Sequence, residues 1–438
     1  MPELSSLTIG YLGLVLLVLC MALRIPIGIS IGMVSIGGIA LLRGPGASIA
    51  ALAGLPFEFA AHWSLSAVPM FLLMGSVAYH TGLTSELFTA ARLWLSSLPG
   101  GLAVATNFAS AGFATVSGSS LATSAAMGRI AIPEMLRLRY DPGLAAGVVA
   151  ASGTLGSLIP PSILFVVYGV FTEQPISKLL IAGILPGLLT ALVYATMIVG
   201  RCALNPSLAP VPAGRASWGE RIAILGKVWP VPVLVFGVAG SLYGGIATTT
   251  EAAAVGAFLT FVIAISRRRL SKSALKESIV EALVGTSSIF FVAIGAILLT
   301  RFLALSGVPA HLAGLMGDWA ADPMLVVLGA SLIYVFLGMF LDPMGLMLVT
   351  LPVLMPIFRA LELDLIWIGV LVIKYLEIGL LTPPVGLSAY VVSGVVGTQI
   401  PLATIFRGLI WFLGAEAVIV MLLITFPPIS LYLPSLMN

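Results

Sequence analysis

Long apolar stretches alternate with short polar ones along the whole chain. The clearest are residues 12–23, 27–42, 180–200, 231–243 and 411–426. With their flanks, such stretches approach or exceed the roughly 20 residues that a helix needs to cross a bilayer. Lipid offers no hydrogen bonds to the backbone, so spanning segments of this kind must be helical. The pattern therefore predicts an all-α protein that crosses the membrane many times.

The same pattern places two sets of five spans on the chain. The first set lies near residues 8–23, 27–42, 66–82, 143–171 and 178–200, and the second near residues 229–245, 249–266, 285–303, 365–395 and 404–426. Amphipathic stretches are expected at residues 48–62 and 84–98. Two further segments, residues 101–136 and 323–358, are expected to form re-entrant helical hairpins, which return to their own side and add no crossing.

A repeat underlies these two sets. Residues 156–161 (GSLIPP) recur as residues 379–384 (GLLTPP), an offset of 223 (383 − 160), and Pro133 matches Pro356 at the same offset. Residues 117–120 fall opposite residues 340–343. Because each copy holds an odd number of spans, the second copy must sit upside down in the membrane. The fold class predicted is therefore an all-α polytopic membrane protein of two inverted repeats of about five spans each, with two re-entrant helical hairpins and two broken helices.

Five segments follow from this division. They are a scaffold at 7–65; an arm, first hairpin and broken helix at 66–203; a cytoplasmic connector at 204–229; a second scaffold at 230–284; and an arm, second hairpin and broken helix at 285–426. The hairpins and broken helices are expected to form a moving transport domain.

Composition and charge support a membrane location and give an orientation. Hydrophobic residues make up 60% of the chain and charged residues 8%, against about 25% charged in soluble domains. Of the 20 Lys and Arg residues, Arg129 and Lys374 fall inside membrane segments. If the connector at 201–227 is placed in the cytoplasm, Arg43, Lys178, Arg301 and Arg359 fall on the extracytoplasmic side. The other fourteen (20 − 2 − 4) fall inside, a strong positive-inside bias. Both termini are then extracytoplasmic, and the first hairpin opens to the cytoplasm.

The proline pairs are the first candidate for function. Proline has no N–H and clashes with the carbonyl four residues back. Pro160 and Pro161 therefore release the carbonyls of Gly156 and Ser157, and Pro383 and Pro384 release those of Gly379 and Leu380. Hydroxyls of Thr154, Ser157 and Thr382 lie nearby. Carbonyl and hydroxyl oxygens suit a small hard cation. The alternative is a kinked helix packed by its neighbours.

The hairpin tips are the second candidate. The first tip contains Ser117, Gly118, Ser119 and Ser120 and is too polar to face lipid, although small residues also allow close helix packing. The second tip runs from Gly338 to Asp342 and Pro343. Asp342 is an acid in an apolar setting, which usually marks function, but it could also cap the half-helix that starts at Pro343. A coupling cation, sodium or a proton, is expected near Ser119, Gly156, Asp342, Gly379 and Thr382.

Other polar residues have simpler interpretations. Thr248 and Glu251 fit a capping box. Lys374 and Glu377, three apart on one helix face, are expected to neutralise each other. Cys20 and Cys202 fit no metal or disulfide pattern.

The chain has no phosphate-binding glycine loop and no His-Glu-x-x-His sequence, which disfavours an ATP-driven pump or a metalloprotease. We expect no enzymatic activity and no cofactor besides coupling ions.

Several motifs together resemble one transporter family. Residues 338–343 (GMFLDP), 376–386 (LEIGLLTPPVG), 250–256 (TEAAAVG) and 153–162 (GTLGSLIPPS) are similar to the large membrane (permease) subunit of tripartite ATP-independent periplasmic (TRAP) transporters, of the C4-dicarboxylate and sialic acid type. Thr249 departs from the pattern, which has proline there. The resemblance implies an elevator-type secondary transporter that imports organic acids with sodium. It also implies a small four-helix membrane subunit, a separate periplasmic binding protein and the bacterial inner membrane.

The leading hypothesis is therefore sodium-coupled import of a small carboxylate delivered by a periplasmic binding protein. One alternative is an anion or dicarboxylate transporter that works without a soluble receptor. Another is a membrane scaffold protein with no transport of its own. The identity of the organic acid is not encoded in these motifs, because a soluble receptor would carry much of the selectivity.

Overall fold

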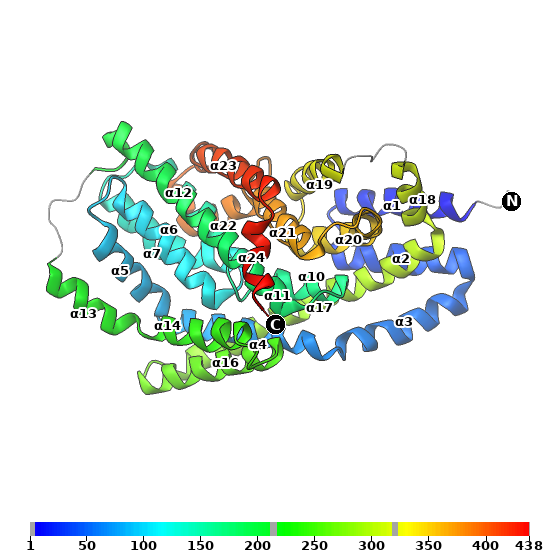
Figure 1. Cartoon of the computed structure of the whole chain (residues 1–438), viewed down its shortest axis with the longest axis horizontal. Helices are drawn as coiled ribbons and strands as arrows, with labels where there is room; N and C mark the ends of the chain where they lie inside the picture. The colour runs from blue at the N-terminus through cyan, green and yellow to red at the C-terminus, as the bar shows by residue number, and fades with distance from the viewer. Residues whose placement is uncertain (1–4, 211–216, 318–322, 438) are drawn as a thin grey trace.

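A computed structural model describes residues 5–210, 217–317 and 323–437. Across these ranges the chain forms helices and connecting turns, without a β-strand. Residues 211–216 of the predicted connector, and residues 318–322 with Ala321 just before the second hairpin, lie outside the described residues. Figure 1 shows the helices in chain order, with the N-terminal helices α1 to α3 at the opposite end of the long axis from α6, α7 and α12.

The helices of the first half come first along the chain. They are α1 (Ser6–Ala22), α2 (Ile27–Arg43), α3 (Pro45–Ala60), α4 (Ala67–His80), α5 (Leu83–Leu95), α6 (Gly101–Ser117), α7 (Ser120–Arg137), α8 (Pro142–Gly153), α9 (Leu155–Leu158), α10 (Ile163–Thr172), α11 (Ile176–Ala182) and α12 (Ile184–Leu204).

The remaining helices form the second half. They are α13 (Trp218–Val228), α14 (Pro230–Val235), α15 (Ser241–Tyr243), α16 (Thr249–Ser266), α17 (Lys272–Ser306), α18 (Val308–Gly317), α19 (Pro323–Gly338), α20 (Pro343–Ala360), α21 (Leu365–Leu381), α22 (Leu387–Val396), α23 (Leu402–Thr425) and α24 (Pro428–Ser435).

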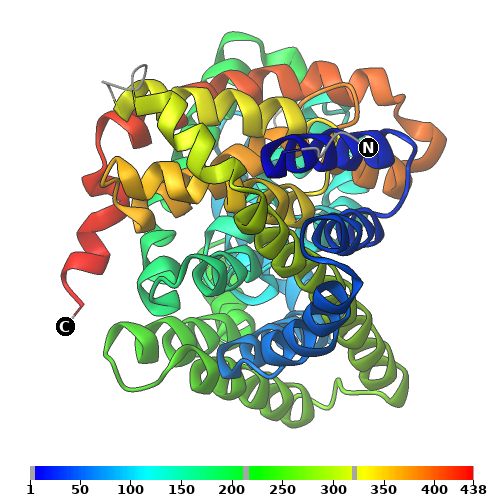
Figure 2. The ribbon, with the colours of Figure 1, turned by 90° about the vertical axis from the view of Figure 1, so that its right-hand side faces the viewer.

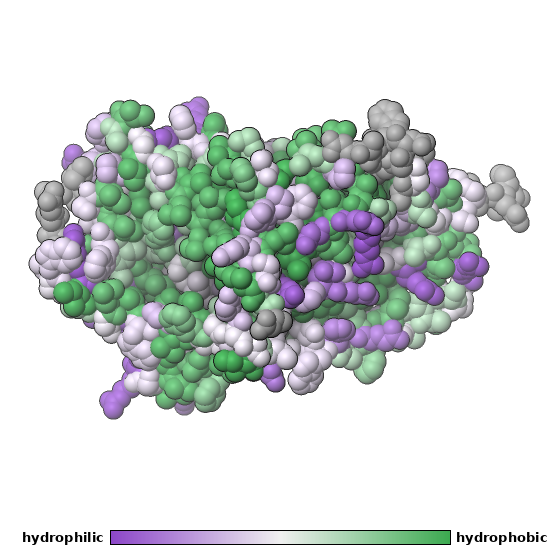
Figure 3. All heavy atoms as spheres, in the orientation of Figure 1, coloured by the Kyte–Doolittle hydropathy of each residue, from purple (hydrophilic) through white to green (hydrophobic). Residues whose placement is uncertain are grey.

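The membrane prediction is confirmed by the apolar helices. Six helical segments in the described part of the chain are long and apolar enough to cross a bilayer, and two bent pairs raise this number to eight. Helices α1 and α2 are apolar but only 17 residues long. Hydrophobic side chains cover much of the face shown in Figure 3, as expected for a surface in contact with lipid.

Two predicted elements differ in length from the structure. The span expected at 285–303 is part of α17, a single helix of 35 residues, because no proline interrupts residues 272–306. The corresponding part of the first half is instead bent by 59° between α3 and the segment Trp63–His80. Figure 2 shows α17 crossing the molecule beside α2 and α3. The predicted connector also contains a helix, α13, which continues toward α15 as one apolar segment.

Local backbone features recur at the offset of the sequence repeat. Arg139 and Glu362 both have positive φ, 59° and 51°, and lie 223 residues apart (362 − 139). Asp141 and Asp364, also 223 apart (364 − 141), cap α8 and α21 with their side chains. The two halves thus share local structure, while the inversion of one half in the membrane stays a prediction.

Candidate functional site

The first hairpin turns at Gly118, between α6 and α7. Its φ of 63° is in the left-handed region that favours glycine. A Cβ atom at this position would also lie 2.6 Å from the carbonyl oxygen of Pro161. Ser119 then caps α7 by accepting a hydrogen bond from the N–H of Ala122 at 3.4 Å. The tip is therefore a tight turn that packs directly on the first proline pair.

The first broken helix consists of α8 and α9, followed by α10 after a bend of 41°. The Pro160–Pro161 peptide bond is cis. The expectation of a free carbonyl at Ser157 is wrong, because the hydroxyl of Ser162 donates to that oxygen at 2.5 Å. Ser162 caps α10 and so supplies the donor that the prolines lack.

The second hairpin and the second broken helix also meet at small residues. A Cβ at Gly379 on α21 would lie 2.7 Å from the Cα of Gly338 at the end of α19. The Pro383–Pro384 bond is cis. The carbonyl of Gly379 was expected to be free, but it accepts a hydrogen bond from the N–H of Thr382 at 3.1 Å. The tight return of the chain after α21 makes this bond possible.

Asp342 occupies the N-cap of α20. Its carboxylate accepts a hydrogen bond from the N–H of Gly345 at 2.8 Å, and Pro343 is the first residue of the helix. Ser119, 223 residues earlier (342 − 119), has the same capping position on α7. The capping interpretation of Asp342 is therefore confirmed, and its role toward a cation stays a prediction.

A buried contact joins the two halves of the site. Ser120, the first residue of α7, donates toward both carboxylate oxygens of Glu377 on α21, at 2.9 and 3.0 Å. The same hydroxyl lies 2.5 Å from that of Ser157 and 3.4 Å from the carbonyl oxygen of Thr154. The Glu377 side chain is fully enclosed. An acid of the second half is thus held by hydroxyls of the first hairpin and the first broken helix.

Lys374 does not neutralise Glu377, contrary to expectation. Its ammonium group lies 2.7 Å from a carboxylate oxygen of Glu416 on α23 and donates to Thr190 on α12 at 3.1 Å. Tyr194 donates to the same Glu416 oxygen. Three residues along a helix are offset by about 60° around its axis, and here Lys374 reaches α12 and α23 while Glu377 reaches α7 and α9. Among the described ion pairs, Glu377 has no cationic partner.

The predicted site residues form two groups in space. The first group contains Ser117, Gly118, Ser119, Ser120, Thr154, Gly156, Ser157, Pro160 and Pro161, and the second contains Gly338, Asp342, Pro343, Gly379, Thr382, Pro383 and Pro384. Close packing joins Gly118 to Pro161 in the first group and Gly338 to Gly379 in the second. The contact between Ser120 and Glu377 links the first hairpin to the second broken helix. The first group is largely buried, whereas Pro383 and Pro384 are exposed.

Glu377 is the residue whose role the sequence interpretation missed. The repeat offers a signal for it, because Thr154 stands opposite at the same offset (377 − 154 = 223). An acid in one copy therefore replaces a hydroxyl in the other, within a segment that a proline pair follows. Such an asymmetry in an apolar helix indicates a charge with a specific task.

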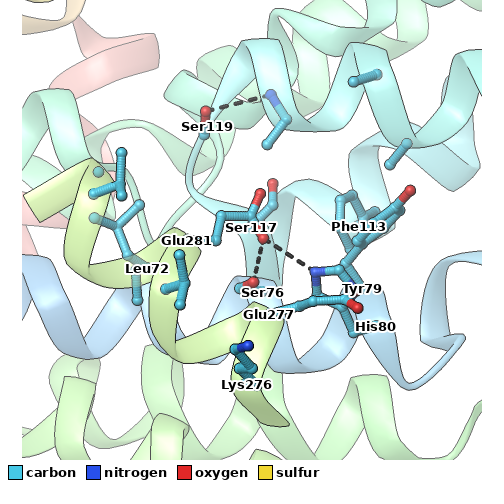
Figure 4. A pocket seen from close by; sticks show the side chains of 18 of the residues that line it. Leu72, Ser76, Tyr79, His80, Phe113, Ser117, Ser119, Lys276, Glu277 and Glu281 are labelled. Atoms are coloured by element: carbon cyan, nitrogen blue, oxygen red, sulfur yellow. Dashed lines mark hydrogen bonds and ion pairs between the residues drawn. The ribbon is translucent and has the colours of Figure 1, made fainter. Parts of the chain in front are cut away.

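A cavity of about 810 Å³ lies beside the first tip. Figure 4 shows Ser117 and Ser119 on the hairpin, Ser76, Tyr79 and His80 on α4, and Lys276, Glu277 and Glu281 on α17, all around this space. The cavity volume is within the usual range for small-molecule sites. The hairpin tip is thus open to a space large enough for a small organic molecule.

Comparison with known proteins identifies the family. Residues 14–429 match the model of the tripartite ATP-independent periplasmic transporter, DctM component. The chain belongs to this family. It is a large permease subunit of a TRAP transporter, of the C4-dicarboxylate and sialic acid type. It is therefore a multi-pass protein of the bacterial inner membrane.

Two curated relatives and one solved structure illustrate the similarity. The chain is 35% identical over 392 residues to the C4-dicarboxylate TRAP transporter large permease protein DctM of Pseudomonas aeruginosa, covering 89% of this chain and 90% of that protein. It is 30% identical over 417 residues to the sialic acid TRAP transporter large permease protein SiaM of Vibrio cholerae, covering 94% and 95%. The crystal structure of the Alcanivorax borkumensis YdaH transporter shares the fold, with a TM-score of 0.61, 14% identity, and coverage of 88% and 89%.

Proposed function

We propose that this TRAP permease imports a small organic carboxylate by coupling its entry to sodium ions. The contact between Ser120 and Glu377 carries the proposal. It places an enclosed acid between the first hairpin and the second broken helix. Burial of a carboxylate without a counter-charge is costly, so a cation bound beside Glu377 would stabilise this arrangement of the two halves.

The residues present suit a sodium ion. The hydroxyls of Ser120 and Ser157, the carbonyl of Thr154 and the carboxylate of Glu377 are all oxygen donors within one cluster. Hard cations prefer such donors. When bound, sodium would supply the positive charge that Glu377 lacks. Ser120 positions the carboxylate, and Gly118 packs closely on Pro161 at the break.

Two further parts of the proposal concern partners. The family name denotes a transporter of three parts, so we propose that a small four-helix membrane subunit and a periplasmic binding protein act with this chain. The relatives DctM and SiaM are named for a C4-dicarboxylate and for sialic acid. Both are carboxylates, which supports a carboxylate as the substrate class here.

Uptake into proteoliposomes tests the proposal. The permease is reconstituted with the small subunit and the binding protein that its own organism encodes, and accumulation of labelled carboxylates is followed under an inward sodium gradient. We expect uptake without ATP, abolished when potassium replaces sodium on both sides. Uptake that persists unchanged in potassium would contradict sodium coupling. Uptake without the binding protein would favour a stand-alone transporter, and transport of no tested anion would favour a scaffold role.

A further inference from the structure

Arg129 lies in the cavity beside the first hairpin without an acidic partner. It is the tenth residue of α7, near the middle of an apolar hairpin, and it is exposed to the cavity. Its guanidinium donates to the hydroxyl of Tyr79 on α4 at 2.9 Å. None of the ion pairs formed by described residues includes Arg129. A charge at such a place is costly to keep and usually serves binding or transport.

The two acids that line the cavity, Glu277 and Glu281, have their partners within it. Glu281 accepts hydrogen bonds from Ser76 and lies 3.3 Å from the His80 ring, and Glu277 lies 3.2 Å from the same ring. Lys276, on the same helix as both acids, lines the cavity and takes part in none of the described ion pairs. Arg129 and Lys276 are therefore the cations of this cavity that no described ion pair neutralises.

We propose that Arg129 and Lys276 form an anion-binding subsite in this cavity, which holds the carboxylate of the substrate on its way between the hairpin tip and the bulk solution. This inference rests on the proposed transport function. Tyr79 acts as a positioning residue, because its hydroxyl occupies one donor of Arg129 and leaves the others for a bidentate contact with a carboxylate.

The subsite is a second station, distinct from the tip. Ten residues separate Ser119 from Arg129 on α7, which corresponds to about 15 Å along the helix axis. The backbone positions of Ser119 and Arg129 are thus further apart than a four-carbon carboxylate is long. Arg129 would therefore bind the anion after it leaves the tip, or before it arrives there from the same side. In the predicted topology this side is the cytoplasm.

The opposite cavity provides a comparison. It has a volume of about 760 Å³ and is lined by Thr300, Arg301, Ala304 and Pro352. Pro352 stands opposite Arg129 in the repeat (352 − 129 = 223). At this repeat position the hairpin helix thus carries a cation in one cavity and a proline in the other, while Arg301 and Arg359 line the second cavity from other positions.

A reporter cysteine tests the subsite without any need for transport. Ala125 lines the cavity one turn before Arg129. In a full-length chain carrying Cys20→Ser and Cys202→Ala, Ala125→Cys is labelled by an anionic and by a cationic methanethiosulfonate, and the ratio of the two rates reports the local potential. We expect Arg129→Gln to lower the preference for the anionic reagent roughly fivefold, and Arg129→Lys to keep most of it. Ala304→Cys in the opposite cavity is the control, and Arg129→Gln should leave its ratio unchanged.

Protection by a carboxylate completes the test. Succinate should slow labelling at position 125, and succinamide, which has the same length but no charge, should not. With Arg129→Gln, at least about tenfold more succinate should be needed, and Tyr79→Phe should weaken protection less than Arg129→Gln does. Equal protection with and without Arg129, or equal protection by succinamide, would refute the subsite. Sodium-driven uptake by the unmodified chain is measured separately, so a failure of the proposed function would be recognised as such.

Discussion

The hydroxyl of Ser120 lies 2.9 and 3.0 Å from the two carboxylate oxygens of Glu377. One residue belongs to the first hairpin and the other to the second broken helix, 257 positions later. A change in the charge of Glu377 therefore changes the strength of a hydrogen bond to the hairpin tip. This contact makes Glu377 the acid whose charge should matter most for coupling.

Glu377→Gln tests that role. Glutamine keeps the length and an oxygen that accepts from Ser120, but it removes the negative charge. We expect the variant to fold normally and its sodium dependence of uptake to weaken tenfold or more, because the enclosed site no longer needs a counter-charge. Glu362→Gln, an exposed acid after the second hairpin, is the matched control and should behave like the wild type. A wild-type sodium response in Glu377→Gln would show that the acid is structural.

Asp342 can be separated into its capping and charge roles. Asparagine caps a helix nearly as well as aspartate, whereas alanine removes the cap at about 1 kcal/mol. We expect Asp342→Asn to keep the thermal stability of the wild type and Asp342→Ala to lower it. We further expect sodium dependence to weaken severalfold in Asp342→Asn. If uptake by that variant responds to sodium as the wild type does, capping of α20 accounts for the residue.

The buried pair of Lys374 and Glu416 should behave as a unit. Both side chains are almost completely enclosed, with exposed fractions of 1% and 0%. Removing one partner of such a pair leaves an uncompensated charge and costs about 3–5 kcal/mol. We expect Lys374→Met to reduce the amount of folded protein strongly and the double variant Lys374→Met, Glu416→Leu to recover most of it. Thermal unfolding in detergent measures both, and additive losses would argue against coupling of the pair.

Close packing of the second hairpin on its broken helix is tested at Gly379. A Cβ there would lie 2.7 Å from the Cα and 2.8 Å from the carbonyl carbon of Gly338, both backbone atoms. We expect Gly379→Ala to force α19 away from α21 and to abolish uptake. Gly394→Ala on α22 is the control, since nothing lies within 4 Å of its added atom, and alanine favours helix. Unchanged uptake in Gly379→Ala would mean that transport does not require close packing of α19 on α21.

The orientation in the membrane is tested by labelling from one side at a time. Ser97 and Glu173 are both exposed and lie on opposite sides in the predicted topology. In the background that lacks Cys20 and Cys202, Ser97→Cys should react with an impermeant reagent only from the cytoplasm. Glu173→Cys should react only from outside. Reaction of both from the same face would overturn the inverted arrangement.

The sequence predicted those parts of the site that depend on single residues with strong local effects. Proline lacks an N–H wherever it stands, so Pro160 and Pro383 mark breaks without knowledge of neighbours. Asp342 marks a helix start for a similar reason. Local signals of this kind located both tips and both breaks.

Partners across the fold could not be predicted in this way. Lys374 and Glu377 are three residues apart, a spacing that suggests an ion pair, yet they face different helices and only Lys374 finds a counter-charge. The carbonyl of Ser157 found a donor in Ser162, beyond the proline pair, and the carbonyl of Gly379 found one in the N–H of Thr382, the residue that ends α21. The role proposed for Arg129 depends on the cavity that the residue lines. The sequence did not indicate that role, because Arg129 lies outside the predicted motifs.

Because α17 is unbroken, it restricts where residues can be inserted or deleted among relatives of this chain. Its 35 residues form one rod about 52 Å long. Inserting or deleting a single residue near its middle would turn everything beyond that point by about 100° relative to everything before it. Glu281 and Arg301, which face cavities from the two ends of this rod, could then no longer both keep their orientation. Relatives with indels should therefore carry them in the loops, and compensated pairs of indels are expected wherever α17 itself changes length.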